Sequence, residues 1–387
     1  MPTLGDQKHT HHDEWINIIV HGSVGSAMEF KYFFTLFKDD VSKTAYHKKT
    51  SEHRHDPKWT KNHAAQGLGL KKIDSSAEHK TAAQLFAQLY DSMQRKFYPD
   101  QTCIGSYTYG WSGVVNHKQR CKDAADFYKE LKELMQTIKK THAQIKIRII
   151  AYSHGGNLVL DMAPEHTNDP NPTNFVINEL VLIATPVQRE TDCYALHPFF
   201  ERIYSIYSRA DCVQKADCFS TAGFFSGRLF CDNSRCPCSK AVQHIELKVT
   251  MAANKDLKPG PTTHSKHRID RSPGHIELWY FADLCEYLCN GKGGSYQPCF
   301  ESKLYRPYFP LEPLPGALLA PGLIFLLQNN ASNCGSIVID VQPDTGKAIV
   351  REKHTSNKQL IDFISPKELD QLRDEAFPHL KKHRIMS

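Results

Sequence analysis

The chain has 387 residues, of which 40% are hydrophobic and 23% are charged, as in ordinary globular proteins. This composition excludes a disordered, collagen-like or coiled-coil chain, and the length suits one large α/β domain with insertions or two to three smaller domains. Lys and Arg outnumber Asp and Glu by 48 to 42, and a net charge of +6 is too diffuse to indicate a nucleic-acid-binding protein.

Apolar runs in the sequence are too short to span a membrane. The nearest candidate, Leu314–Leu327, is interrupted by Pro315 and Pro321, so packing onto the core is the favoured interpretation and peripheral membrane contact the alternative. Residues 1–14 form a polar tail without the apolar stretch of a secretory signal. We therefore expect a cytoplasmic protein with reduced thiols, although signal-independent bacterial secretion also fits the sequence. The oligomeric state stays unknown.

Hydrophobic patterning predicts strands that alternate with helices, which is typical of βαβ units and of an α/β fold with a mainly parallel central sheet. A polar stretch, 38–80, is expected to run over the surface between the first strand and the first helix. The predicted strands are 15–20, 103–107, 145–151, 180–184, 203–207 and 242–249. The predicted helices are 81–98, 118–140, the segment starting at 157 and running to 163, and the amphipathic segment 276–288.

The last quarter of the chain, 291–387, differs in character and is predicted to be a C-terminal extension of a domain that spans 15–290. It begins with a Pro-rich stretch. The turn residues Pro343-Asp344-Thr345-Gly346 between two short apolar runs are typical of a β-hairpin. The predicted elements of this extension are strands at 336–341 and 348–351 and a polar helix at 366–376.

The segment IKIRIIAYSHGGNLVL, residues 145–160, carries the strongest functional pattern. A buried strand ends at Ala151, a helix begins after Gly155, and Ser153 lies in the sharp turn between them. Such a turn needs small residues two positions before and after the serine, and it exposes the serine as a nucleophile at the carboxyl end of a strand. A helix-capping serine is the alternative, but the strand and the helix on either side favour the nucleophile.

This strand, turn and helix around Ser153, called the nucleophile elbow, resemble those of the α/β-hydrolases, within the broad group of bacterial lipases and esterases. Here A-x-S-x-G stands for the usual G-x-S-x-G. Three further segments match in chain order within residues 15–290: His21-Gly22 resembles an oxyanion-loop motif, Trp111-Ser112-Gly113 resembles a subgroup of bacterial hydrolases, and Ala184-Thr185-Pro186 resembles the G-T-P strand end of lipases. The resemblance implies the α/β-hydrolase fold.

The resemblance also implies a catalytic triad in the chain order serine, acid, histidine. Asp211, which follows the predicted strand 203–207, is the expected acid, and Asp217 is the reserve. His275, just before the last predicted helix of the domain, is the expected base, and His264 is the alternative. A third histidine, His244, lies within a predicted strand, where packing is the favoured role.

The implied activity is hydrolysis of carboxylic esters, such as lipid or acyl esters, through an acyl-enzyme. The backbone N–H groups of Ser23 and His154 are the expected oxyanion donors, and His21 is expected to brace the oxyanion loop. We expect no cofactor and no metal at this site. Two alternatives stay open: a non-catalytic binding protein of the same fold, and an acyltransferase that uses the same triad.

Four cysteines cluster in a predicted insertion, 214–240, between the expected acid and the next strand. Their spacing, C-x4-C-x-C after the first cysteine, lacks the paired C-x2-C of common zinc sites. Free thiols are therefore favoured, and a metal site or disulfides are the alternatives. The four residues are Cys218, Cys231, Cys236 and Cys238.

Overall fold

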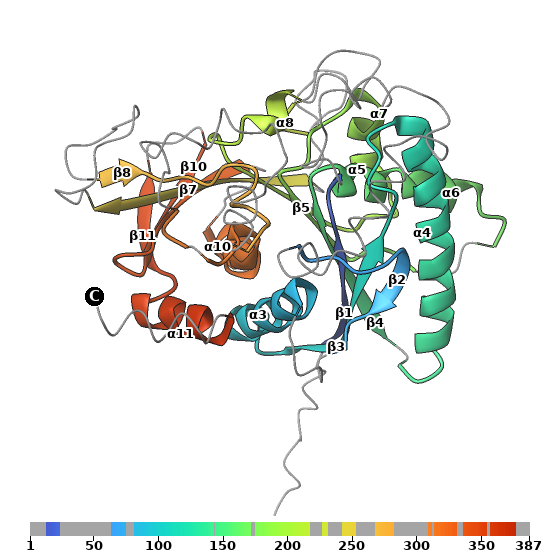
Figure 1. Ribbon diagram of the computed structural model, residues 1–387, viewed down its shortest axis with the longest axis horizontal. Coiled ribbons are helices and arrows are strands. Elements are labelled where there is room, and N and C mark those ends of the chain that lie inside the picture. Colours follow the sequence, from blue (N-terminus) through green and yellow to red (C-terminus); the bar gives the residue numbers. More distant parts are fainter. Residues whose placement is uncertain are drawn as a thin grey trace, which may run out of the picture.

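The computed structural model describes residues 13–23, 63–74, 81–142, 144–171, 175–216, 227–230, 242–252, 268–281, 309–311, 313–330, 336–353 and 357–376. Within these residues the protein is an α/β structure built on one 11-stranded sheet (Figure 1). The order along the sheet is β11-β10-β9-β7-β6-β5-β4-β1-β3-β2, and β8 pairs with β7 beside this path. The bounds are β1 Asp13–Val20, β2 Gly69–Lys72, β3 Gln101–Gly110, β4 Ile145–Tyr152, β5 Glu179–Ile183, β6 Ile203–Tyr207, β7 Val242–Ala252, β8 Arg268–Asp270, β9 Ser336–Gln342, β10 Lys347–Glu352 and β11 Lys358–Asp362.

The sheet is parallel from β3 to β9, through β1, β4, β5, β6 and β7. Antiparallel pairs occur where β2, β8, β10 and β11 join it. The parallel central strands are buried on both faces, so their sequences are nearly continuous apolar runs, as in ELVLI of β5. The mainly parallel sheet that the alternating pattern predicts is thus present.

Each face of the sheet carries its own hydrophobic core, and successive residues of a strand belong to different cores. In β4, Ile149 and Ala151 pack into one core, while Ile150 and Tyr152 pack into the other. This follows from the two-residue repeat of a strand. Figure 1 shows α4, α5, α6 and α7 on one side of the sheet and α3, α10 and α11 on the other.

The helices form where the sequence gives an apolar stripe and a capping residue. Thr81 caps α3 with a full capping box, because its backbone N–H donates to Gln84 Oε1 at 2.7 Å while its hydroxyl accepts from the Gln84 N–H. The α-helices are α3 Ala82–Phe97, α4 His117–Ile138, α5 His154–Leu160, α6 Met162–Asn168, α7 Arg189–Asp192, α8 Val213–Ala216, α10 Ala320–Asn330 and α11 Pro366–Ala376. The 3-10 helices of the described ranges are η2 Cys193–Leu196 and η4 Gly316–Leu319.

The C-terminal strands continue the central sheet. The chain crosses over through η4 and α10 to place β9 parallel to β7, and the predicted hairpin of β9 and β10 is followed by β11. The apolar run Leu314–Leu327 is buried in the core beside α3, as the packing interpretation expects. None of the described helices is long and apolar enough to cross a membrane.

Three strands of the structure were absent from the sequence prediction: β2, β8 and β11. The predicted helix 276–288 does not begin where expected, since residues 275–279 form turns, and its part beyond Phe281 lies outside the described residues. Backbone hydrogen bonds tie this segment instead to the C-terminal part, with the N–H groups of Gly316 and Ala317 donating to the carbonyls of Glu277 and Leu278.

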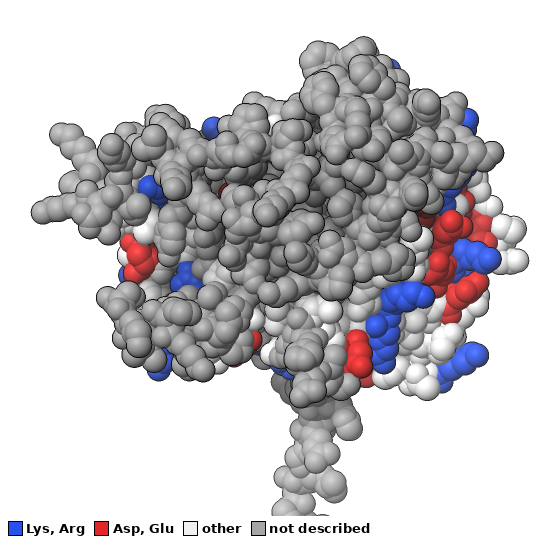
Figure 2. All heavy atoms as spheres, in the orientation of Figure 1, with Lys and Arg blue, Asp and Glu red and all other residues white. Residues whose placement is uncertain are grey.

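Charged side chains of both signs lie side by side on the surface over α4, at the right of Figure 2. This helix and the two residues after it include six lysines and three acidic residues at exposed or half-buried positions: Lys118, Lys122, Lys129, Lys132, Lys139, Lys140, Asp126, Glu130 and Glu133. The visible, described part of this face therefore mixes both signs of charge.

Candidate active site

Ser153 occupies a strained turn at the carboxyl end of β4. Its backbone angles are φ 51° and ψ −130°, in a region that residues other than glycine rarely adopt. Two hydrogen bonds fix this geometry: the Ser153 N–H donates to the Ile183 carbonyl at 2.8 Å, and the Gly156 N–H donates to the Ser153 carbonyl at 3.0 Å. The next residue, His154, begins α5. The strand, turn and helix that the sequence pattern predicts are all in place.

The residues around Ser153 are small because other backbone segments pass close by. A Cβ added to Gly155 would lie 2.4 Å from the carbonyl oxygen of His21, so only glycine fits there. At the following glycine, Gly156, an added Cβ would instead meet side chains, and it would lie 2.1 Å from Thr185 Oγ1. Ala151 is fully buried. The contact with His21 gives the physical reason for the glycine of A-x-S-x-G, and burial favours a small residue at the alanine.

The structure brings Ser153, His275 and Asp211 together from three separate places in the chain. His275 Nε2 lies 3.1 Å from Ser153 Oγ, and His275 Nδ1 lies 2.7 Å from Asp211 Oδ2. The Asp211 side chain is fully buried, and that of His275 is 13% exposed. Because the carboxylate can only accept, Nδ1 carries the proton, which leaves Nε2 as the acceptor for the serine hydroxyl.

Asp211 is itself held in place by the segment that follows β6. Its Oδ1 accepts the backbone N–H of Gln214 at 3.1 Å, and the Gln214 side chain donates to the Thr185 carbonyl at 2.6 Å. Its Oδ2 is thereby directed at His275. Through Gln214, these hydrogen bonds connect the acid to Thr185, in the segment after β5.

The segment His21-Gly22-Ser23 follows β1 and lies against the elbow. A Cβ added to Gly22 would be 3.0 Å from Ser153 Cβ. His21 braces this segment: its Nδ1 is 2.6 Å from the Gly22 carbonyl, and its Nε2 accepts the Trp111 backbone N–H at 3.3 Å. The Trp111 indole donates to the His21 carbonyl at 2.8 Å. Of the expected oxyanion donors, Ser23 directly follows Gly22 in this segment, and His154 directly follows Ser153 as the first residue of α5.

The remaining sequence candidates lie elsewhere. His244 is buried in β7, where its Nε2 accepts the Phe230 backbone N–H at 3.0 Å, which matches the packing role expected for it. The other candidates lie outside the described residues: His264, Asp217, Cys218, Cys231, Cys236 and Cys238.

Sequence reasoning missed several residues that shape the site. Asn157, in α5, accepts from the Thr191 hydroxyl at 2.5 Å and donates to the Pro186 carbonyl at 2.9 Å, so it ties the elbow helix to the segment after β5. His63 packs edge-on against His21 and Tyr280, with ring centroids 5.6 Å and 4.8 Å apart. Asn157 could have been found from the sequence, because it directly follows the two glycines after Ser153. His63 could not, because it lies in a polar stretch without a hydrophobic pattern or motif.

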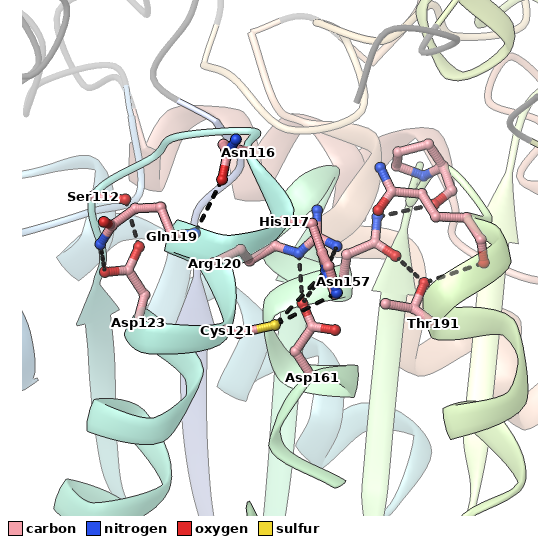
Figure 3. Close-up of polar contacts among 12 residues, drawn as sticks. Ser112, Asn116, His117, Gln119, Arg120, Cys121, Asp123, Asn157, Asp161 and Thr191 are labelled. Carbon is pink, nitrogen blue, oxygen red and sulfur yellow. Dashed lines mark hydrogen bonds and ion pairs between the residues drawn. The ribbon is translucent and has the colours of Figure 1, made fainter. Parts of the chain in front are cut away.

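A second polar group lies between α4 and the junction of α5 and α6 (Figure 3). Among the described residues, His117, Cys121 and Asp161 form the group whose metal-ligating atoms all lie within 4.8 Å of one another. Arg120 already occupies it: its Nε donates to Asp161 Oδ2 at 2.6 Å and its Nη2 lies 3.1 Å from His117 Nδ1. Asp161 Oδ2 and His117 Nδ1 are thus both within hydrogen-bonding distance of a buried guanidinium, whose positive charge disfavours a cation at this place.

The group is better explained as a buried ion pair that joins α4 to the α5–α6 junction. The side chains of Arg120 and Asp161 are 0% and 1% exposed. Burial, together with the nearby Asp161 charge, raises the pKa of the Cys121 thiol to about 11. A thiol protonated at neutral pH is a poor nucleophile and a poor metal ligand.

Neither a protein-family profile nor a curated protein sequence matches this chain. The chemistry of the site therefore rests on the geometry of Ser153, His275 and Asp211 and on the α/β structure that positions them.

Proposed function

We propose that the protein is a serine hydrolase of the α/β-hydrolase fold that cleaves carboxylic esters, with Ser153 as nucleophile, His275 as base and Asp211 as acid. One observation carries the proposal. Two consecutive hydrogen-bonding distances, 3.1 Å and 2.7 Å, join the three side chains, and the serine lies in a strained turn at the carboxyl end of a parallel strand.

In the proposed reaction, His275 Nε2 takes the proton of the Ser153 hydroxyl as Oγ attacks the carbonyl carbon of the ester. The buried Asp211 carboxylate holds the imidazole in the required tautomer and stabilises the imidazolium that forms. His275 then protonates the leaving alcohol, and an acyl-enzyme remains on Ser153. Water, deprotonated by the same histidine, attacks the acyl group and releases the acid.

The negative charge that develops on the carbonyl oxygen needs donors already aimed at it. The backbone N–H of His154 at the start of α5 and that of Ser23 are the proposed pair, since Gly22 and Gly155 let the two segments approach each other. Removing one such donor costs about 2.7–4 kcal/mol of transition-state stabilisation. The close approach of the segment after β1 to the turn at Ser153, which Gly22 and Gly155 allow, is therefore part of the proposal.

The test is hydrolysis of a p-nitrophenyl ester series from C2 to C16 acyl chains. Ser153→Ala and His275→Ala are expected to lower kcat by about 10⁴-fold or more, and Asp211→Asn by about 10⁴-fold because the tautomer is no longer fixed. His264→Ala is the matched control and should keep wild-type turnover. The optimum chain length then separates an esterase from a lipase.

Two other outcomes would redirect the assignment. A wild-type protein that hydrolyses no ester and is not labelled on Ser153 by a fluorophosphonate would contradict the proposal and favour the non-catalytic binding protein. Faster release of product with an alcohol acceptor than with water, abolished by Ser153→Ala, would make the protein an acyltransferase.

A further inference from the structure

Tyr152 directly precedes the nucleophile in the chain and contacts both the segment that carries His275 and the segment that carries Gly22. The residue is 2% exposed, and its hydroxyl donates to the backbone carbonyl of His275 at 2.9 Å. Its ring lies 4.9 Å from the His275 ring and stacks on Trp279 at 4.9 Å with only 5° between the planes. One side chain on the nucleophile strand therefore holds both the backbone and the ring of the base.

The segment that carries His275 has little regular structure of its own. Between the end of β8 and residue 281 it consists of irregular backbone, turns and a bend. Hydrogen bonds anchor it on either side of the histidine, where the Arg271 N–H donates to Val249 and the Glu277 carbonyl accepts from Gly316. At the histidine itself, the backbone carbonyl accepts a hydrogen bond from the Tyr152 hydroxyl.

The same ring also supports the oxyanion segment. A Cβ added to Gly22 would lie 2.9 Å from Tyr152 Cδ1 and 3.2 Å from Cε1, so the backbone of Gly22 rests on the tyrosine ring. The Tyr152 side chain thus contacts both the base and the oxyanion segment. Its backbone is bonded to Ser153, so one residue connects all three.

We propose that Tyr152 is a positioning residue whose hydroxyl, by holding the His275 carbonyl, sets the distance between His275 Nε2 and Ser153 Oγ. This inference rests on the proposed function. Burial raises the pKa of the Tyr152 phenol well above its ordinary value, so the hydroxyl keeps its proton over the working range of a hydrolase. The bond to the carbonyl is therefore present at every pH at which the enzyme would act.

The test compares Tyr152→Phe, which keeps the ring and removes the hydroxyl, with Tyr109→Phe. Tyr109 is a matched control, because it is also buried and donates to a backbone carbonyl, that of Asp123, at 3.0 Å, on the opposite face of the sheet. A loosened base should misplace Nε2 by a fraction of an ångström, and misplacement of 1 Å costs about 100-fold. We expect kcat of Tyr152→Phe to fall about 10-fold with KM within twofold of wild type, and Tyr109→Phe to keep wild-type kcat.

Turnover is normalised to sites titrated with a fluorophosphonate, so that unfolded protein does not count. Wild-type kcat per titrated site in Tyr152→Phe would overturn the proposal, and so would an equal loss of kcat in Tyr109→Phe. The NMR signals of the His275 ring give a readout that needs no turnover. They should shift or broaden in Tyr152→Phe only, and unchanged signals would refute the positioning role even if the esters prove to be the wrong substrates. Full activity of Ser153→Ala would instead refute the proposed function.

Discussion

Replacing Gly155 with alanine tests whether the close approach of the elbow to the oxyanion segment matters for catalysis. The added Cβ would lie 2.4 Å from the His21 carbonyl oxygen, whereas real Cβ atoms essentially never come within 3.0 Å of such a neighbour. The two segments must therefore separate by at least the difference, 0.6 Å. Because both are backbone, no side-chain rotation can relieve the clash.

The expected loss follows from this displacement. If 1 Å of misplacement costs about 100-fold in rate, 0.6 Å should lower kcat by about 10-fold or more. The crowding itself should reduce the free energy of unfolding by about 1–3 kcal/mol. The atoms that the added Cβ would meet belong to Val20 and His21 and not to Asp211 or His275, so the loss should arise at the oxyanion step.

The assay is kcat on the best p-nitrophenyl ester, normalised by fluorophosphonate titration, together with thermal unfolding. Gly67→Ala is the control, since a Cβ there would meet nothing within 4 Å and both quantities should stay at wild-type values. A Gly155→Ala protein with wild-type kcat and wild-type Tm would refute the reasoning, because it would mean that the segment after β1 is not held against the elbow.

Three further predictions concern stability and reactivity. Thr81→Ala removes the capping box of α3 and should lower the free energy of unfolding by about 1 kcal/mol in urea titrations. Arg120→Met leaves the buried Asp161 carboxylate without its guanidinium partner and should lower the free energy of unfolding by about 3–5 kcal/mol. The double variant Arg120→Met/Asp161→Leu removes the unpaired charge and should regain much of this loss. A double variant no more stable than the single one would contradict this account. With its pKa raised to about 11, Cys121 should be alkylated by iodoacetamide at pH 8 about 100-fold more slowly than the exposed Cys193, as followed by peptide mass spectrometry, and the rate should rise with pH up to that pKa.

The central part of the fold could be predicted from the sequence because local signals agree there. The buried strands are continuous apolar runs, and the two long helices have apolar stripes with capping residues at their starts, such as Thr81. The strands β2 and β11 were not predicted, because edge strands are short and polar and lack an apolar run. The sequence KQLID of β11, for example, is mostly exposed. The pairing of β9 with β7 depends on residues about 90 positions apart in the chain, and no local pattern encodes such a partner.

The candidate site could be predicted where a residue type coincides with a strand end. Ser153 directly follows the apolar strand β4, Asp211 lies in the loop just after β6, and His275 was favoured over His264 by its place in the chain. The supporting contacts could not be predicted. Nothing around Tyr152 in the sequence says that its hydroxyl reaches a carbonyl 123 residues away, because this contact exists only after the sheet has formed.

The parallel pairing of β9 with β7 bears on how the protein is made. On the ribosome, β4 and β6, which precede Ser153 and Asp211, emerge long before β9. The edge of β7 that pairs with β9 therefore stays open until residues 336–342 have been synthesised. An open strand edge is a template for association with other chains. A chain that stops before Ser336 should therefore accumulate in inclusion bodies rather than yield a smaller soluble enzyme, and nascent chains at this stage are expected to depend on chaperones that shield exposed strands.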